Sequence, residues 1–211
     1  MNSVEFSALL LLTTAASFTP GPNTTLSTAL AANFGLKRAL GFVVAVPVGW
    51  GLLLSLCAGG VGALVVAVPM LRLAITLVGV SYLLWLAWRL GGIRFEWRTG
   101  TWSQAQPHWH TDCSRLDVTF WQGVLLQFLN IKAWMLALTV VAGWLAGRPD
   151  ALARFAVVLP VMLMFGLLSN LSYALMGSLL REWLAQGARL RWFNRGMAAV
   201  LVLTAIWMAT L

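Results

Sequence analysis

The sequence predicts an all-α membrane protein with six transmembrane helices, arranged as a 3+3 inverted repeat whose first helix is broken in each half. Of its 211 residues, 60% are hydrophobic and 9% are charged, whereas a soluble domain carries about 25% charged residues. Several apolar stretches are also longer than the roughly 20 residues that cross a bilayer core. We therefore expect a single transmembrane domain over 1–211, with one repeat near 1–90, a cytoplasmic loop near 90–118 and a second repeat near 119–211.

Apolar length and the polar or Gly/Pro residues between apolar runs predict six spans, near 6–34, 39–60, 70–89, 119–146, 151–180 and 192–211. The run that holds the second and third spans contains a single charge, Arg72. Its two helices would be joined by a tight apolar turn around Gly60, Gly62 and Pro69. One span followed by a re-entrant segment is the alternative. The opening apolar run follows Glu5 and no basic residue, which favours a retained span over a signal peptide.

The positions of Lys and Arg indicate the orientation, because positively charged loops tend to stay in the cytoplasm. If the N-terminus lies outside, ten basic residues fall in cytoplasmic loops: Lys37, Arg38, Arg89, Arg94, Arg98, Arg115, Arg181, Arg189, Arg191 and Arg195. Three fall on the opposite side, at Arg72, Arg148 and Arg154. This split predicts that both termini lie on the outer, periplasmic side.

Two prolines and a glycine interrupt the first span at its middle, in Pro20-Gly21-Pro22-Asn23. Proline has no backbone N–H, and unpaired backbone groups are costly in lipid, so the break should face the protein interior or a watery cavity. Pro22 can begin a second half-helix, whose first amides would point into the gap with the side chains of Asn23 and Thr24. The positive end of a helix attracts an anion, so a substrate carboxylate is the natural ligand. A proline kink without function is the alternative.

A lysine lies in the middle of the fourth span, in Asn130-Ile131-Lys132. A basic side chain at a helix centre costs roughly 2.5 to 3.5 kcal/mol on insertion scales, so a partner or a water-filled site should compensate it. Snorkelling is the alternative, but it works best near helix ends.

Both interruptions fall in the first span of a three-span half. An odd number of spans per half inverts the second half, so the two breaks would meet where the halves meet.

These residues resemble a known family, the lysine exporter and threonine-homoserine resistance translocators (LysE/RhtB), over nearly the whole chain. The resemblance is carried by Pro20-Gly21-Pro22-Asn23, by Gly35, Lys37, Arg38, Gly41 and Gly49, by Gly79-Val80-Ser81-Tyr82-Leu83-Leu84-Trp85-Leu86, and by Gln127-Phe128-Leu129-Asn130-Ile131-Lys132-Ala133. It implies a secondary transporter of the bacterial inner membrane that exports small amino acids, driven by the proton motive force, with no cofactor. Asn23, Asn130 and Lys132 are the family-matching polar positions.

The chain departs from the family pattern at two positions. Many members have an acidic residue just after the glycine that falls here at Gly49, where this chain has Trp50, and a proline where it has Ile131. Without that carboxylate the chain lacks an obvious proton carrier and an ammonium partner. The Asn-Ile-Lys form and the missing acid resemble the cysteine/O-acetylserine exporter branch. Homoserine- or threonine-like substrates are the alternative.

The residues themselves also favour a site for a zwitterion. The half-helix amides and Lys132 would bind its carboxylate, and Asn side chains with freed carbonyls would bind its ammonium. Asn170 and Tyr173 of the fifth span and Trp50 of the second are further candidates for the wall. The full predicted set of substrate-binding residues is Pro20, Gly21, Pro22, Asn23, Thr24, Trp50, Asn130, Lys132, Asn170 and Tyr173.

Other classes of function have little support in the sequence. The basic residues form no stripe interleaved with exposed aromatics, which argues against nucleic-acid binding. The spans contain no paired aspartates, no Ser-His combination and no HExxH, so we do not expect an enzyme. His108, His110, Asp112 and Cys113 cluster in the loop before the fourth span, and we interpret them as loop residues rather than a metal site. A non-catalytic channel or a structural membrane subunit is the alternative function, and small-residue faces are compatible with a homodimer.

Overall fold

The computed structural model describes residues 1–92, 118–186 and 188–210, and every regular element in these ranges is a helix. The elements are α1 (Ser3–Phe18), α2 (Pro22–Phe34), α3 (Leu36–Ala58), α4 (Val61–Ala67), α5 (Pro69–Gly91), α6 (Phe120–Leu129), α7 (Ile131–Val140), the π-helical turn η2 (Val141–Leu145), α8 (Ala151–Leu184) and α9 (Arg189–Ala209). The predicted all-α class is confirmed for these residues. The histidines, aspartate and cysteine of the loop, His108, His110, Asp112 and Cys113, lie outside the described ranges.

Four helices, α3, α5, α8 and α9, are long and apolar enough to cross a membrane. The pair Phe120–Leu129 and Ile131–Leu145 passes the same test as one span with a bend of 69°, which gives up to five spans in the described residues. α1 is apolar but has 16 residues, about 24 Å of helix at 1.5 Å per residue. That is shorter than the roughly 30 Å of a hydrocarbon core. The fold is thus that of a multi-pass membrane protein, and the sixth span stays a prediction.

The connection between α3 and α5 is longer than the predicted tight turn. Gly60 has a φ of 100°, a left-handed conformation that favours glycine, and it precedes the short helix α4. Pro69 then begins α5, where its missing N–H costs no helical hydrogen bond. α3 and α5 have 23 residues each, so both are long enough to cross a membrane, which favours two spans over one span with a re-entrant segment.

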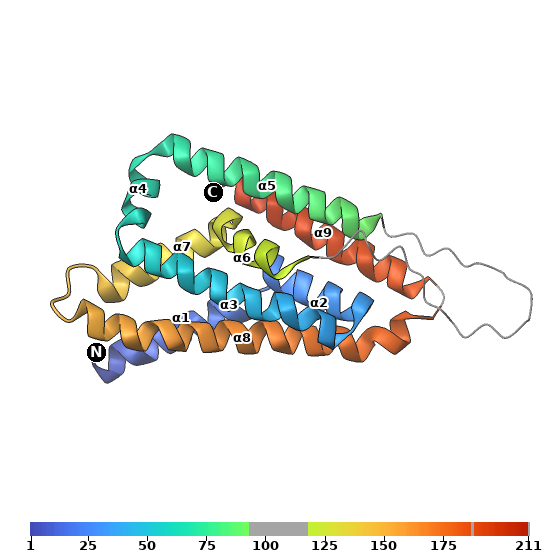
Figure 1. Ribbon diagram of the computed structural model, residues 1–211, viewed down its shortest axis with the longest axis horizontal. Helices are drawn as coiled ribbons and strands as arrows, with labels where there is room; N and C mark the ends of the chain where they lie inside the picture. The colour runs from blue at the N-terminus through green and yellow to red at the C-terminus, as the bar shows by residue number, and fades with distance from the viewer. Residues whose placement is uncertain (93–117, 187, 211) are drawn as a thin grey trace, which may run out of the picture.

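The helices run back and forth along one long axis (Figure 1). α1 and α2 follow one another beside α8, while α5 and α9 lie antiparallel to each other at the other side of the molecule. Between them, α3 packs against α2, α6 and α8. The N-terminus lies at the same end as α4, and the turn between α2 and α3 lies at the opposite end. This arrangement brings the interruption of α1 and α2 close to that of α6 and α7.

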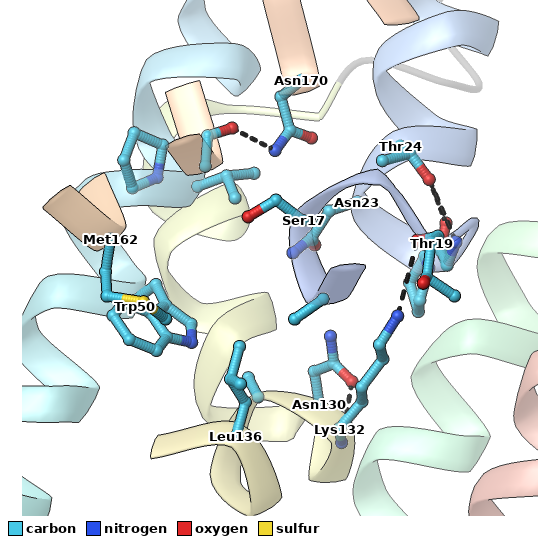
Figure 2. A pocket seen from close by; sticks show the side chains of 17 residues that line it. Ser17, Thr19, Asn23, Thr24, Trp50, Asn130, Lys132, Leu136, Met162 and Asn170 are labelled. Atoms are coloured by element: carbon cyan, nitrogen blue, oxygen red, sulfur yellow. Dashed lines mark hydrogen bonds between the residues drawn. The ribbon is translucent and has the colours of Figure 1, made fainter. Parts of the chain in front are cut away.

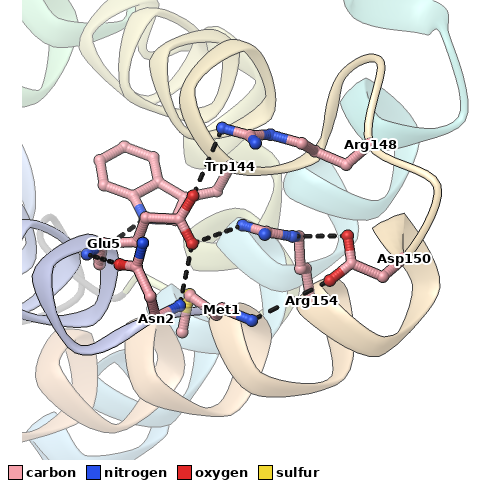
Figure 3. Close-up of polar contacts among 7 residues, drawn as sticks. All are labelled: Met1, Asn2, Glu5, Trp144, Arg148, Asp150 and Arg154. Carbon is pink, nitrogen blue, oxygen red and sulfur yellow. Dashed lines mark hydrogen bonds and ion pairs between the residues drawn. The ribbon is translucent and has the colours of Figure 1, made fainter.

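An ionic cluster fixes the start of α1 against the start of α8 (Figure 3). Arg154 donates to Glu5 over 3.0 Å and to Asp150 over 2.7 Å. Arg148 forms a second ion pair with Glu5 over 3.4 Å. Arg154 is 9% exposed, and the two carboxylates compensate a guanidinium withdrawn from water. Trp144 of η2 donates its indole N–H to the Glu5 carbonyl over 3.0 Å, so the cluster joins α1, η2 and α8.

Candidate functional site

The first break separates α1 from α2 over residues 19–21. A helical carbonyl normally accepts from the N–H four residues further along the chain, and proline has no N–H. Pro20 therefore offers no donor to the carbonyl of Ala16, and Pro22 offers none to the carbonyl of Phe18. The last carbonyls of α1 depend on donors from elsewhere in the protein.

Side chains of α7 and α8 supply most of those donors. Ser169 Oγ donates to the Ser17 carbonyl over 2.6 Å, Tyr173 OH to the Phe18 carbonyl over 3.0 Å, and Lys132 Nζ to the Thr19 carbonyl over 3.4 Å. The carbonyl of Ala16 has no donor among the described residues. One acceptor at the end of α1 is therefore open.

The start of α2 has open backbone donors instead. The Gly21 N–H donates to the Thr24 hydroxyl over 3.0 Å, and that hydroxyl donates to the Gly21 carbonyl over 3.1 Å. Within the described chain, the amides of Asn23 and Thr24 have no acceptor, as is usual in the first turn of a helix. Nine of the 13 residues of α2 are buried, so this positive helix end is held inside the protein.

The second break is a single residue, Asn130, between α6 and α7. Its side-chain oxygen accepts from the Lys132 amide over 3.1 Å and caps the start of α7. At the end of α6, the indole N–H of Trp134 donates to the Phe128 carbonyl over 2.8 Å. The bend places Lys132 in the first turn of α7, beside the end of α1.

Two glycines let neighbouring helices pack directly on the α6 backbone. A Cβ on Gly79 of α5 would collide with the carbonyl oxygen of Leu129, the last residue of α6. A Cβ on Gly49 of α3 would come within 2.6 Å of the Val124 carbonyl oxygen, nearer the start of α6. Neither neighbour is a flexible side chain that could move aside. The position of the second break is therefore fixed by close backbone packing.

A cavity of about 90 Å³ lies between the two breaks, several times the roughly 10–15 Å³ that one ordered water requires. The predicted residues that line it are Gly21, Pro22, Asn23, Thr24, Trp50, Asn130, Lys132 and Asn170. Figure 2 shows Asn130 and Lys132 at one side of the cavity, with Trp50 across from them. Two predicted residues are not among its lining: Pro20 is exposed, and Tyr173 donates to the carbonyl of Phe18.

Two of the predicted amide side chains already have protein partners. Asn23 and Gln127 of α6 form a reciprocal pair, with N···O distances of 2.8 and 3.1 Å. Asn170 accepts from Ser27 over 3.0 Å and donates to the Gly166 carbonyl over 2.8 Å. These bonds hold α2 against α6 and α8. They also leave fewer free polar groups for a ligand than the sequence suggests.

The sequence did not single out several residues at this site. Gln127 is fully buried and holds Asn23 in place, and its position three residues before Asn130, at the start of the motif that resembles the family, was the available signal. Ser17 and Met162 line the cavity. Nothing in their sequence surroundings separates them from ordinary residues of membrane helices.

The cavity has a positive side that carries no acidic counter-charge. Lys132 and the starts of α2 and α7 bring positive charge to it. The lining residues include no carboxylate, and the acidic residues in the described part of the chain, Glu5, Asp150 and Glu182, lie elsewhere. The carbonyl end of α1, with the open acceptor at Ala16, provides the opposite polarity. The geometry therefore suits an anionic group near Lys132 and a cationic group beside the end of α1.

A helical membrane bundle with two interrupted helices around a central cavity is an arrangement typical of transporters. The family described as LysE type translocator matches residues 14–211. A cysteine/O-acetylserine efflux protein of Klebsiella pneumoniae subsp. pneumoniae is 30% identical over 210 residues, which cover 98% of this chain and 97% of the relative. Proteins of the same name from Shigella flexneri serotype 5b and Escherichia coli K12 are each 24% identical over 209 residues, 99% of this chain and 97% of each relative. No solved structure matches the chain.

The chain therefore belongs to the LysE type translocators, and the resemblance found in its motifs is confirmed. This is a family of membrane transporters for amino-acid efflux, so the chain is a transporter and not an enzyme, as the sequence predicts.

Proposed function

We propose that the protein is a secondary transporter that exports a small amino acid across the bacterial inner membrane. The observation that carries the proposal is the cavity between the two breaks. The starts of α2 and α7 and the side chain of Lys132 lie beside it. The relatives named as cysteine/O-acetylserine efflux proteins support a substrate of that class. Homoserine- and threonine-like substrates are the second choice.

The substrate would bind as a zwitterion with both charged groups at the wall that Lys132 and the helix breaks form. Its carboxylate would accept from the open amides of Asn23 and Thr24 and from the ammonium of Lys132. Hydrogen bonds to an ionised acceptor are roughly twice as strong as neutral ones. Its ammonium would donate to the open carbonyl of Ala16 and to the Thr19 carbonyl, which Lys132 releases when it turns to the carboxylate.

We also propose that α1 and α2 cross the membrane together, which completes six spans and the 3+3 inverted repeat. Their 16 and 13 residues together exceed the roughly 20 that a span needs. Six spans put both termini on one side, and the basic loops indicate that this side is the periplasm. In a Cys113→Ser background, Pro149→Cys should react with a membrane-impermeant thiol reagent added from the periplasm, and Lys37→Cys should not. The opposite labelling pattern would reverse the orientation.

The proton motive force is the proposed energy source for export. Among the residues that line the cavity, Lys132 is the one with a readily titratable side chain, and a lining carboxylate is absent. A protonophore should therefore abolish accumulation of substrate in inverted vesicles but leave exchange of substrate for substrate intact. Accumulation that persists with the protonophore would require another energy source.

A homodimer is proposed from the small-residue faces of the helices. A Cβ added to Gly41, Gly143 or Gly196 would meet nothing within 4 Å, so these positions leave space for close approach of a second helix. Cross-linking of cysteines placed at these positions should give a dimer, and a monomer at every position would argue against it.

Efflux of cysteine, O-acetylserine, homoserine, threonine and lysine from cells that express the chain tests the function. At least one of the first four should leave these cells faster than control cells. Lys132→Met should reduce that rate by about 10- to 150-fold, since a hydrogen bond to a charged group contributes about 1.5–3 kcal/mol. Lys37→Met is the matched control, because Lys37 is exposed at the start of α3 and is not among the residues that line the cavity.

Two outcomes of this experiment would reject the proposal in different ways. Efflux of none of the five amino acids would exclude an exporter for this class of substrate. Efflux that is not accelerated by substrate on the other side of the membrane would indicate a channel, since a carrier exchanges substrate and a channel does not.

A further inference from the structure

Trp50 places an unpartnered hydrogen-bond donor on the cavity wall across from Lys132. Its side chain is 8% exposed and lines the cavity from α3. Figure 2 shows the indole nitrogen on the side of the ring that is turned toward the cavity and Lys132. Within the described chain, this N–H has no acceptor.

Two other indoles in the bundle show how the N–H of a buried or partly buried tryptophan is normally paired. Trp134 is 5% exposed and donates to the Phe128 carbonyl over 2.8 Å. Trp144, which is partly buried, donates to the Glu5 carbonyl over 3.0 Å. A buried indole usually finds an acceptor, and its N–H can only donate. Among the described residues, the N–H of Trp50 is not one of the polar atoms buried without a partner, so it opens on the cavity, where an acceptor of a ligand can reach it.

The wall around Trp50 determines which part of the ligand that acceptor belongs to. The side chains of Val46, Leu136 and Met162 make this wall largely apolar. The sulfur of Met162 lies 2.8 Å from the hydroxyl of Thr13, which is fully buried. The charged groups of a bound amino acid belong at the opposite wall, near Lys132 and the helix breaks. Its side chain is therefore the part that meets Trp50.

We propose that the Trp50 N–H donates to an acceptor oxygen on the substrate side chain, and so selects amino acids with hydroxyl or ester side chains over aliphatic ones of the same shape. This inference rests on the proposed function. An aliphatic side chain would bury the N–H without an acceptor, which is the situation that polar binding sites reject most strongly. A side-chain ammonium would face a second donor in a cavity whose lining has no carboxylate.

Homoserine and norvaline form a matched pair for the test, because norvaline has a methyl group in place of the homoserine hydroxyl. Both would be offered to the full chain in proteoliposomes, as competitors of a labelled substrate. The wild type should favour homoserine, and Trp50→Phe, which keeps an aromatic ring but removes the donor, should reduce that preference by about 2- to 12-fold. Trp88→Phe is the matched control, since Trp88 is 71% exposed and should leave the preference unchanged.

The outcomes separate this inference from the proposed function. If the wild type binds homoserine and norvaline equally, or if Trp50→Phe weakens the binding of both by the same factor, Trp50 does not distinguish between substrate side chains. If Trp50→Phe does not fold, the wild type provides the test, and equal binding of homoserine and norvaline by the wild type overturns the inference. If the wild type transports neither homoserine nor any other small amino acid, the proposed function itself has failed.

Discussion

The two breaks beside the cavity arise in different ways. The first depends on two prolines, Pro20 and Pro22, which remove two backbone donors within three residues of chain. The second consists of Asn130 alone and contains no proline. It is supported by the Asn130 cap on α7 and by Gly79, which lets α5 pack on the end of α6. The first break is thus a local property of the sequence, and the second a property of the packed helices.

The helices on either side of the breaks differ in burial as well. α1 has two buried residues, Leu9 and Thr13, whereas α2 has nine. α6 and α7 have four and five buried residues in ten each. α1 is therefore held mainly at its two ends, by the ionic cluster at Glu5 and by the side chains that donate to its last carbonyls. We expect α1 to be the half-helix that separates most easily from the bundle.

The largest effect is expected at the packing contact that supports the second break. Gly79→Ala would push a Cβ into the carbonyl oxygen of Leu129, and overpacking of this kind costs about 1–3 kcal/mol. The melting temperature of the protein in detergent should fall. Gly166→Ala is the control, because its Cβ would meet nothing within 4 Å and alanine favours a helix. Equal melting temperatures for the two variants would show that the contact is not needed.

The cap of α7 should affect both stability and transport. Asn130→Ala removes the acceptor of the Lys132 amide, and loss of such a cap costs about 0.5–2 kcal/mol. Thr119→Ala removes the corresponding cap of α6, which accepts from Gln122 over 3.3 Å and does not line the cavity. Both variants should melt earlier, and Asn130→Ala alone should bind substrate more weakly. A similar loss of binding in both would mean that the cap acts only through stability.

The prolines of the first break should affect substrate affinity more than stability. Pro20→Ala restores an N–H that can donate to the Ala16 carbonyl, so the proposed ammonium site would be filled from within the chain. Affinity for homoserine should fall by about 2- to 12-fold, the usual effect of one hydrogen bond. Pro160→Ala inside α8 gives the control, since it adds an N–H at a residue that does not line the cavity. Unchanged affinity in Pro20→Ala would remove the Ala16 carbonyl from the site.

The smallest effect is expected at the ionic cluster that holds the start of α1. The hydrogen bond from Arg154 holds the pKa of Asp150 below its ordinary value. The stability from this bond is therefore present at neutral pH and is lost as the pH falls below about 3.9, the usual Asp value, through the lowered pKa. The melting temperatures of the wild type and Asp150→Asn should differ slightly at pH 7, and the difference should shrink as the pH falls through the lowered pKa of Asp150. A difference that grows in acid would contradict this assignment.

The sequence predicted the parts of the fold that depend on local chemistry. Apolar length gave α3 at 36–58 against an expected 39–60, and the cost of a charge in lipid pointed to Lys132 as a residue at the cavity. The Gln127 pair with Asn23 and the Gly79 contact could not be predicted, because both depend on which helices become neighbours. The partners of the freed carbonyls are unpredictable for the same reason. The sequence therefore placed Tyr173 in the cavity wall, whereas its hydroxyl donates to the Phe18 carbonyl and the residue is not in the lining.

The central claim is that the two half-helix starts and Lys132 bind the carboxylate of the substrate. Competition by homoserine and by its carboxamide, measured with the wild type and with Lys132→Met, tests this claim most directly. The wild type should bind homoserine at least about tenfold more tightly than the carboxamide, because the amide lacks the charge that these donors recognise. In Lys132→Met the difference should shrink. Equal binding of the two compounds by the wild type would contradict the carboxylate site.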